Sequence, residues 1–340
     1  MNTMLGPLRR WAFRLPPVET SYATRGFRGA TQQMQARLEQ IGAIFLQGYH
    51  AALAAGVPDG IGPALEEVDR ELRGFAFEGA AMGFALLDWL TPWQATRLQG
   101  FLRGAGDAHA YMVNVAVGWV WARVPFGVER GRRRLEPLLG WLAFDGWGFH
   151  EGFFHWPKYI AAQPRKPAGV QGYAERVFDQ GLGRSFWFVN GGNAEMIIRT
   201  IEAFPAERQS DLWSGLGLAA TYAGFASQNT LNTLLEGAGV YRASLGQGAA
   251  FASKARQRAG NLTDYTDLAA RTLCGISAAE AARLCDSTLE NLAPSGDVPA
   301  YEVWRLRIQE HFSRNLKSPI NATAQEFLGR AAAPVQLQAL

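Results

Sequence analysis

Glycines recur along this chain at a nearly constant spacing, inside stretches that have helical hydrophobic periodicity. The strings are FEGAAMG, HEGFFHW, FDQGLGR, WSGLGLA and LGQGAAF, and a polar residue precedes a glycine in each of them: Glu78, Glu151, Gln180, Ser214 and Gln247. The last three steps are 29, 34 and 33 residues, and Val117-Gly118 lies near the middle of the longer first step. A period of about 34 residues is typical of a two-helix hairpin repeat.

Glycine in a helix interior costs up to about 1 kcal/mol relative to alanine. Its repetition in register therefore indicates helices that approach each other so closely that a Cβ atom would collide. The sequence predicts an all-α fold of helical hairpins, arranged as a tetratricopeptide-like superhelix or as a closed α/α ring. In either arrangement the five polar residues are expected to form one column that faces a groove or a cavity.

Apolar residues recur at helical spacing from Ala30 onward, and period-two runs typical of strands are absent. We expect an N-terminal arm over residues 1–25, a single helical-repeat domain over 26–332 and a tail over 333–340. The turn signals predict helices over 31–55, 65–90, 92–102, 108–124, 135–156, 173–189, 194–204, 210–223, 229–236, 243–258, 264–273, 278–292, 298–314 and 322–332.

Composition restricts the classes of partner and compartment. A net charge of +3 on 340 residues does not predict nucleic-acid binding, and two cysteines fit a reducing compartment. The N-terminus has no uninterrupted apolar segment of the secretory kind, so a cytoplasmic location is expected. The apolar stretch 110–124 is shorter than a membrane span and contains Asn114 and Arg123.

The N-terminal arm is basic and aromatic, since Arg9, Arg10, Trp11, Phe13 and Arg14 fall within six residues. Such a segment is a candidate for peripheral contact with an acidic membrane surface. A strand-like or coil arm packed across the domain is the preferred interpretation.

The densest group of chemically active side chains lies between Asp145 and Trp156. Asp145, His150 and Glu151 are candidate acid and base groups if they are buried together, and Trp147 and Phe149 would line the pocket. Ordinary packed histidines and a surface glutamate are the alternative. His155 follows His150 by five residues, which places the two imidazoles about 140° apart on an ideal helix and argues against a shared metal ion.

A second group lies between Phe178 and Phe188. Asp179 could pair with Arg184 near the start of a helix, and Trp187 and Phe188 could present ring faces to a substrate. A protonated acid beside aromatic rings is what acid-initiated polyene cyclisation requires. The alternative is a buried ion pair that joins adjacent repeats.

Motifs for common cofactors are missing or lie in the wrong context. The strings GLGRSF, GLGLAA and GQGAAF lie within expected helices, whereas a dinucleotide fingerprint needs a preceding strand. There is no GxxxxGK[ST], GxSxG or HExxH string. The sequence therefore requires no cofactor and no metal.

Six longer strings carry a family resemblance: FAFEGAAMGFALLDWLTP, HAYMVNVAVGWVWARVP, LLGWLAFDGWGFHEGFFHW, FDQGLGRSFWFVNG, FPAERQSDLWSGLGLAATYAG and LGQGAAFASKARQRAGN. Over roughly residues 25–310 the chain resembles the bacterial UnbL-type family of unknown function, often labelled "enediyne biosynthesis protein". The resemblance implies a role in maturing an enediyne polyketide, because such members sit beside the iterative polyketide synthase. It supplies no established catalytic residues.

Two functions follow as expectations. The first is an enzyme of natural-product biosynthesis that acts on a hydrophobic polyene, with a terpene cyclase of non-standard type as a variant. Its acid and base groups would be Asp145, His150, Glu151 and Asp179, and its binding residues would be Glu78, Trp147, Phe149, Gln180, Arg184, Trp187, Phe188, Ser214 and Gln247. The second is a non-catalytic scaffold that binds a biosynthetic partner protein. An enclosed apolar cavity would favour the enzyme, and an open polar groove would favour the scaffold.

Overall fold

The computed structural model describes residues 5–163, 166–294 and 297–316, and every regular element in these ranges is a helix. The expected all-α fold is confirmed. The α-helices are α1 (Leu5–Ala12), α2 (Tyr22–Arg25), α3 (Gln32–Ala55), α4 (Gly62–Glu66), α5 (Arg73–Leu90), α6 (Arg97–Arg103), α7 (Ala110–Arg123), α8 (Val128–Arg132), α9 (Leu142–Phe154), α10 (Tyr173–Val189), α11 (Ala194–Glu202), α12 (Ala206–Tyr222), α13 (Gln228–Gly237), α14 (Arg242–Arg258), α15 (Asp264–Cys274), α16 (Ala278–Ser287) and α17 (Ala300–Leu316).

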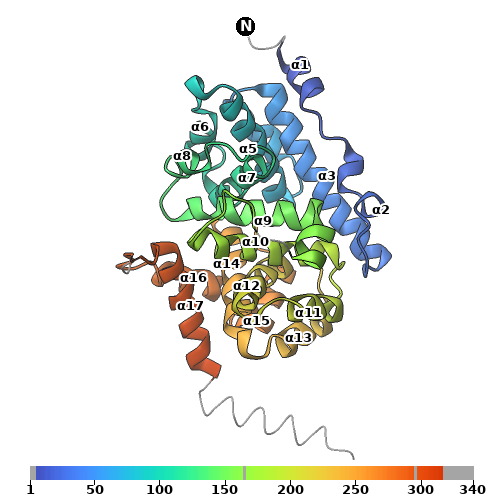
Figure 1. Ribbon diagram of the computed structural model, residues 1–340, viewed down its shortest axis with the longest axis vertical. Helices are drawn as coiled ribbons and strands as arrows, with labels where there is room; N and C mark the ends of the chain where they lie inside the picture. The colour runs from blue at the N-terminus through green and yellow to red at the C-terminus, as the bar shows by residue number, and fades with distance from the viewer. Residues whose placement is uncertain (1–4, 164–165, 295–296, 317–340) are drawn as a thin grey trace, which may run out of the picture.

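The longer helices form one continuous row. Helices α3, α5, α7, α9, α10, α12, α14 and α16 each pack against the next in this order, while α11, α13 and α15 pack beside one another as a second layer. Figure 1 shows α3, α5 and α7 in the upper part of the molecule, α9 and α10 across its middle, and α11, α13 and α15 below. No helix in the described ranges has the length and hydropathy to cross a membrane, and this includes α7.

Glycines set the spacing within the row. A Cβ atom on Gly79 of α5 would collide with the carbonyl oxygen of Phe45 on α3, and one on Gly48 of α3 would collide with the carbonyl of Ala76. The same reciprocal contact recurs at four more pairs of helices. The glycines are Gly118 and Gly146 between α7 and α9, Gly148 and Gly181 between α9 and α10, Gly183 and Gly215 between α10 and α12, and Gly217 and Gly248 between α12 and α14. The expectation of close helix approach at the repeated glycines is therefore confirmed.

The row curves back on itself. The Tyr222 hydroxyl at the end of α12 lies where a Cβ on Gly74 of α5 would be, and Arg256 of α14 donates to the carbonyl oxygen of Glu71 (3.1 Å) just before α5. Arg70 donates to the carbonyl of Gly260 (2.9 Å) after α14. These contacts join early and late helices, so the ring-like alternative describes the chain better than an open superhelix.

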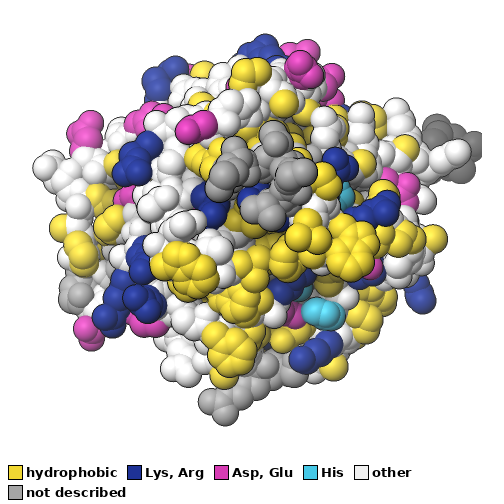
Figure 2. Space-filling model, turned by 90° about the horizontal axis from the view of Figure 1, so that it is seen from above, with side chains coloured by type: hydrophobic (Ala, Val, Ile, Leu, Met, Phe, Trp, Pro, Cys, Tyr) yellow, Lys and Arg dark blue, Asp and Glu magenta, His cyan; other side chains and the backbone are white. Residues whose placement is uncertain are grey.

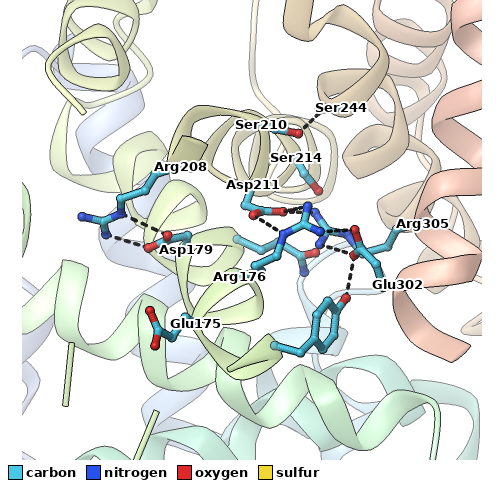
Figure 3. A network of polar contacts seen from close by, with 12 residues as sticks. Glu175, Arg176, Asp179, Arg208, Ser210, Asp211, Ser214, Ser244, Glu302 and Arg305 are labelled. Atoms are coloured by element: carbon cyan, nitrogen blue, oxygen red, sulfur yellow. Dashed lines mark hydrogen bonds and ion pairs between the residues drawn. The ribbon is translucent and has the colours of Figure 1, made fainter. Parts of the chain in front are cut away.

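Helix α17 is held against α10 and α12 by ion pairs in which Asp211, Glu302 and Arg305 are buried and Arg176 is partly exposed. Arg305 contacts Asp211 (2.7 Å) and Glu302 (3.0 Å), and Arg176 contacts Asp211 (2.9 Å) and also Glu302. Figure 3 shows these four side chains converging between the three helices. Two guanidinium groups and two carboxylates balance in charge, which offsets the desolvation that burial of each one alone would require.

Several predicted boundaries are wrong. The predicted helix over 65–90 is two helices, because a turn at Asp69 accepts backbone hydrogen bonds from Leu72 and Arg73 (2.9 Å each). The predicted helix over 135–156 starts later and ends at Phe154, shortly before Pro157, which has no N–H to donate. The N-terminal arm, expected to be strand-like or coil, contains α1 and α2. The helix predicted over 322–332 and the tail over 333–340 lie outside the described residues.

The reciprocal glycines make a direct prediction about stability. A Gly217→Ala substitution should lower the free energy of unfolding by roughly 1–3 kcal/mol, because the added methyl group meets the Leu245 carbonyl oxygen and the backbones must separate. Urea denaturation followed by circular dichroism measures this change. Gly100→Ala on α6 is the matched control, since its Cβ would lie 3.1 Å from a Pro58 side-chain atom and far less must move. Equal stabilities of the two variants would contradict the packing argument.

Candidate functional site: an aromatic cavity

An internal cavity lies among α3, α5, α7, α9, α10 and α12. Its volume, measured as the space open to the centre of a water molecule, is about 60 Å³. Its wall is mostly aromatic and aliphatic, and the rings on it are Phe45, Phe75, Trp119, Phe149, Phe153, Phe154, Phe188 and Tyr222. Such a site suits an apolar ligand that is oriented by a few polar groups.

The segment between α1 and α2 completes the wall with Leu15, Glu19 and Thr20. Two side chains of α3 hold this segment: the Tyr49 hydroxyl donates to the Phe13 carbonyl oxygen (3.0 Å), and His50 Nε2 accepts from the Leu15 N–H (3.3 Å). The cavity is thus covered by a short connection that a few hydrogen bonds attach to the helices.

Glu78 is the carboxyl group that a helix of the row places on the cavity wall, where Glu19 is the other carboxyl group. It is the one charged residue between Arg73 and Asp88 on an otherwise apolar α5, and its side chain is buried. The Trp119 indole N–H donates to Glu78 Oε1 (3.1 Å) and fixes the direction of the carboxyl group. Burial raises the pKa of Glu78 to about 7, against the lowering effects of the Arg184 guanidinium and the Trp119 hydrogen bond. Glu78 therefore holds a proton near neutral pH.

Arg184 also lies on the wall, and Asp145 stands behind it. Arg184 Nε is 2.6 Å from Asp145 Oδ1, and Gln180 donates to the other carboxylate oxygen of Asp145 (2.7 Å). The Arg184 guanidinium lies over the Phe149 ring, 4.8 Å from its centroid. One guanidinium nitrogen, Nη2, is buried and has no hydrogen-bond partner among the described residues. Asp145 is thus bound to a cation and is not a free acid in the cavity.

Two more polar groups reach the wall. The Tyr222 hydroxyl is buried without a hydrogen-bond partner in the described ranges, and burial raises the pKa of this phenol to about 12, so that it stays protonated. Arg123 at the end of α7 lies over the Phe154 ring at 5.3 Å. Glu78, Tyr222, Arg184 and Arg123 are therefore the groups on the helices of the row that can orient a ligand.

Four of the predicted binding residues lie on the cavity wall: Glu78, Phe149, Arg184 and Phe188. Trp147 and Trp187 do not. Trp147 packs beside Gly169, Trp187 packs beside Gly192, and both side chains are almost fully buried in the helical core. Their prediction as pocket residues fails because a ring that fills the space between helices has the same sequence signal as a ring that lines a pocket.

The prediction that the five polar residues form a single column is wrong. Glu78 faces the cavity, but Gln180, Ser214 and Gln247 lie under α17: Gln180 donates to the Tyr301 hydroxyl (3.2 Å), and Ser214 donates to Gln247 (2.8 Å). Gln247 also accepts from Arg305 (3.3 Å). Ser214 and Gln247 bond to each other, Gln180 and Gln247 bond to α17, and none of the three lines the cavity.

Asp179 lies on a different face of α10 from the cavity wall. Its carboxylate contacts Arg208 of α12 (2.6 Å) and Lys166 (2.7 Å), and not Arg184. Figure 3 shows Asp179 facing Arg208, apart from the ion pairs around Asp211. The predicted Asp179–Arg184 pair is wrong, and the alternative of an ion pair that joins neighbouring helices describes Asp179.

His150 and Glu151 lie behind the cavity wall rather than on it. Burial lowers the pKa of His150 to about 4, and its ring is 4.8 Å from the ring of Phe154. Against the raising effect of burial, the imidazoles of His150 and His155 hold the pKa of Glu151 below its usual value. Neither predicted catalytic side chain is part of the cavity lining.

Sequence reasoning missed Trp119, Arg123, Tyr222 and the segment after α1. Trp119 has a usable signal, because it follows Gly118 at the point where the repeat lacks its polar residue. Tyr222 and Leu15 carry none, since their positions depend on how the row of helices curves.

Residues 4–312 match the family model described as "Protein of unknown function (DUF1702)", and the chain belongs to this family. No curated protein and no solved structure matches the chain.

The Glu78 pKa predicts a pH-dependent stability. The carboxyl group has a pKa of about 7 in the folded chain against 4.5 without the fold's influence, so the unfolded state loses its proton first as pH rises. Wild-type stability should fall between pH 4.5 and 7, by up to about 3 kcal/mol from this group. Glu78→Gln lacks this loss, so its melting temperature should rise relative to wild type from pH 5 to pH 8.

Asp145→Asn is the contrasting variant for the same melting experiment. It leaves the Arg184 cation buried without its counter-ion and should lower stability at every pH in this range. Melting temperatures that change with pH in the same way for wild type and Glu78→Gln would contradict the raised pKa of Glu78.

Proposed function

We propose that this protein binds an apolar, polyene-like molecule in the aromatic cavity and that Glu78 donates a proton to it. The observation that carries the proposal is a carboxyl group with a pKa of about 7 on the wall of an apolar, ring-lined cavity. An acid is most effective when its pKa lies near the working pH. Trp119 binds Oε1, which leaves Oε2 to carry the proton.

The chemistry needs no external oxidant or reductant. Transfer of the Glu78 proton to one carbon of a double bond leaves a carbocation on the polyene. A new carbon–carbon bond can form when a second double bond of the polyene attacks this carbocation. Loss of a proton from a neighbouring carbon back to the carboxylate restores the acid, so the net change is an isomerisation or cyclisation. The ring faces of Trp119, Phe45 and Phe149 stabilise the cation.

The resemblance to the enediyne-associated family supports a polyketide-derived polyene as the ligand class, within natural-product biosynthesis. An isoprenoid chain, handled by a terpene cyclase of non-standard type, would use the same acid and the same rings. A scaffold that binds a partner protein has less support, because Gln180 and Gln247, expected in its groove, bond to α17, and Ser214 bonds to Gln247.

Proton donation can be tested with parinaric acid, a fluorescent conjugated polyene. In D₂O the wild-type protein should bind the probe and incorporate deuterium into it, as measured by mass spectrometry. Glu78→Gln should still bind the probe, shown by energy transfer from tryptophan, but should incorporate deuterium at least about a hundredfold more slowly.

Glu175→Gln is the matched control for the deuterium experiment, because Glu175 is an exposed acid of α10 outside the cavity. It should leave both binding and incorporation unchanged. Full incorporation by Glu78→Gln would refute the acid role, and absence of probe binding to the wild type would refute the cavity as a polyene site.

We propose further that the protein contacts an anionic membrane through the end that carries α1. Trp11 on α1 is 80% exposed and Trp93, which follows α5, is 77% exposed. Figure 2, viewed from this end, shows hydrophobic side chains gathered with Lys and Arg side chains among them. Aromatic side chains with adjacent arginines suit a membrane interface, and Leu15, just after α1, borders the cavity that would receive a lipophilic molecule.

Vesicle sedimentation tests the membrane contact. The protein should bind vesicles that contain phosphatidylglycerol more strongly than vesicles of phosphatidylcholine alone, because Arg9, Arg10 and Arg14 add charge attraction. A Trp11→Ser, Trp93→Ser double variant should lose at least about tenfold in binding. Val240→Ser, at a residue that is 90% exposed between α13 and α14, should change nothing, and an equal loss there would contradict the assignment.

A further inference from the structure

A compact group of ligand atoms lies at the end of α9. Helix α9 ends at Phe154, and His155 has left the helical conformation, with φ −126° and ψ 33°. The backbone at this residue therefore turns the His155 side chain back toward the last turn of α9. The angular argument from an ideal helix, which separates His150 from His155, does not apply, because the two residues do not belong to one continuous helix.

Glu151 lies between the two imidazoles. Its Oε2 is 2.8 Å from His155 Nδ1, and its Oε1 is 3.6 Å from His150 Nδ1. One ligand atom from each of the three residues lies within 4.8 Å of the other two. This geometry combines two nitrogen donors with one carboxylate around a common point.

His150 supplies an independent observation. Its side chain is buried, and its Nδ1 atom has no hydrogen-bond partner among the described residues. A buried polar atom without a partner costs about 1–3 kcal/mol. Nδ1 is the ring nitrogen nearest to Glu151, so a cation bound at the common point would satisfy it.

We propose that His150, Glu151 and His155 bind a divalent transition-metal ion. Two imidazoles and a carboxylate form a common three-residue set for zinc and related ions, with a further coordination position left open. Tetrahedral zinc with bonds of about 2.0–2.1 Å needs ligand atoms ~3.3 Å apart, so the most distant pair must approach by no more than about 1.5 Å. His155 can make this movement, because its side chain is about half exposed and lies beyond the helix.

The three proposed ligand residues lie next to aromatic residues that line the cavity. Phe149, Phe153 and Phe154 lie on the same helix and line the cavity wall. An ion bound to Glu151 and His155 would join the last turn of α9 to the residue after it and would hold these rings in place. The exposed edge of His155 gives the ion a path from solvent.

Zinc titration of the full chain tests the site. After treatment with a chelator and dialysis, calorimetry should show one zinc ion bound per chain, and cobalt should give the visible absorption bands of a low-symmetry site. His155→Ala should weaken zinc binding at least about tenfold. This variant changes a half-exposed residue outside a helix, so the fold should persist, which circular dichroism verifies.

His311→Ala on α17 is the matched control and should leave zinc affinity unchanged. Glu151→Gln, which keeps the shape of the side chain, should weaken binding as His155→Ala does. Absence of zinc binding by the wild type, or equal affinities for wild type and His155→Ala, would overturn the proposal. Neither result bears on Glu78, because probe binding and deuterium incorporation are measured separately.

Discussion

Contact between a glycine and a carbonyl group of the neighbouring helix fixes the geometry of this fold. Five neighbouring pairs of long helices make that contact in both directions, so their backbones touch where they cross. Side chains are then displaced to either side of each crossing, where they can be large. Helices α5 and α7 also pack together, but the glycines of each make their closest contacts elsewhere. Glu78 and Trp119 meet between these two helices, and the cavity borders them.

Buried carboxyl groups have two kinds of surroundings in this molecule. Asp211 and Glu302 each contact two guanidinium groups, and Asp145 contacts one, so these carboxylates form ion pairs that join helices. Glu78 forms no ion pair within the described ranges and receives only the indole hydrogen bond of Trp119. Its raised pKa keeps Glu78 in the neutral form up to about pH 7. Glu78 can therefore transfer a proton, whereas the paired carboxylates hold helices together.

The sequence could predict the helices, because hydrophobic periodicity and turn residues act locally; the helix over 173–189 has the predicted bounds. The repeated glycines also predicted the close packing, since a steric demand at one residue has few other causes. The functions of acidic residues were harder to predict. Asp145, Asp179 and Glu78 are all carboxyl groups among aromatic residues, but the chain supplies Arg184 to the first, Arg208 and Lys166 to the second, and no cation directly to the third. Those partners depend on how the row curves, which no local pattern contains.

The docking of α17 has a consequence for how the chain is made. Asp211 leaves the ribosome before Arg305, which lies 94 residues later in the sequence. Gly183 and Gly215, through which α10 and α12 touch, are likewise synthesised before Arg305. The partners that α17 supplies to Asp211, Gln180 and Gln247 are therefore the last members of this polar group to be synthesised. Synthesis thus completes the residues of the backbone contacts before those of the charge pairs, because α17 is the last of the described helices in the sequence.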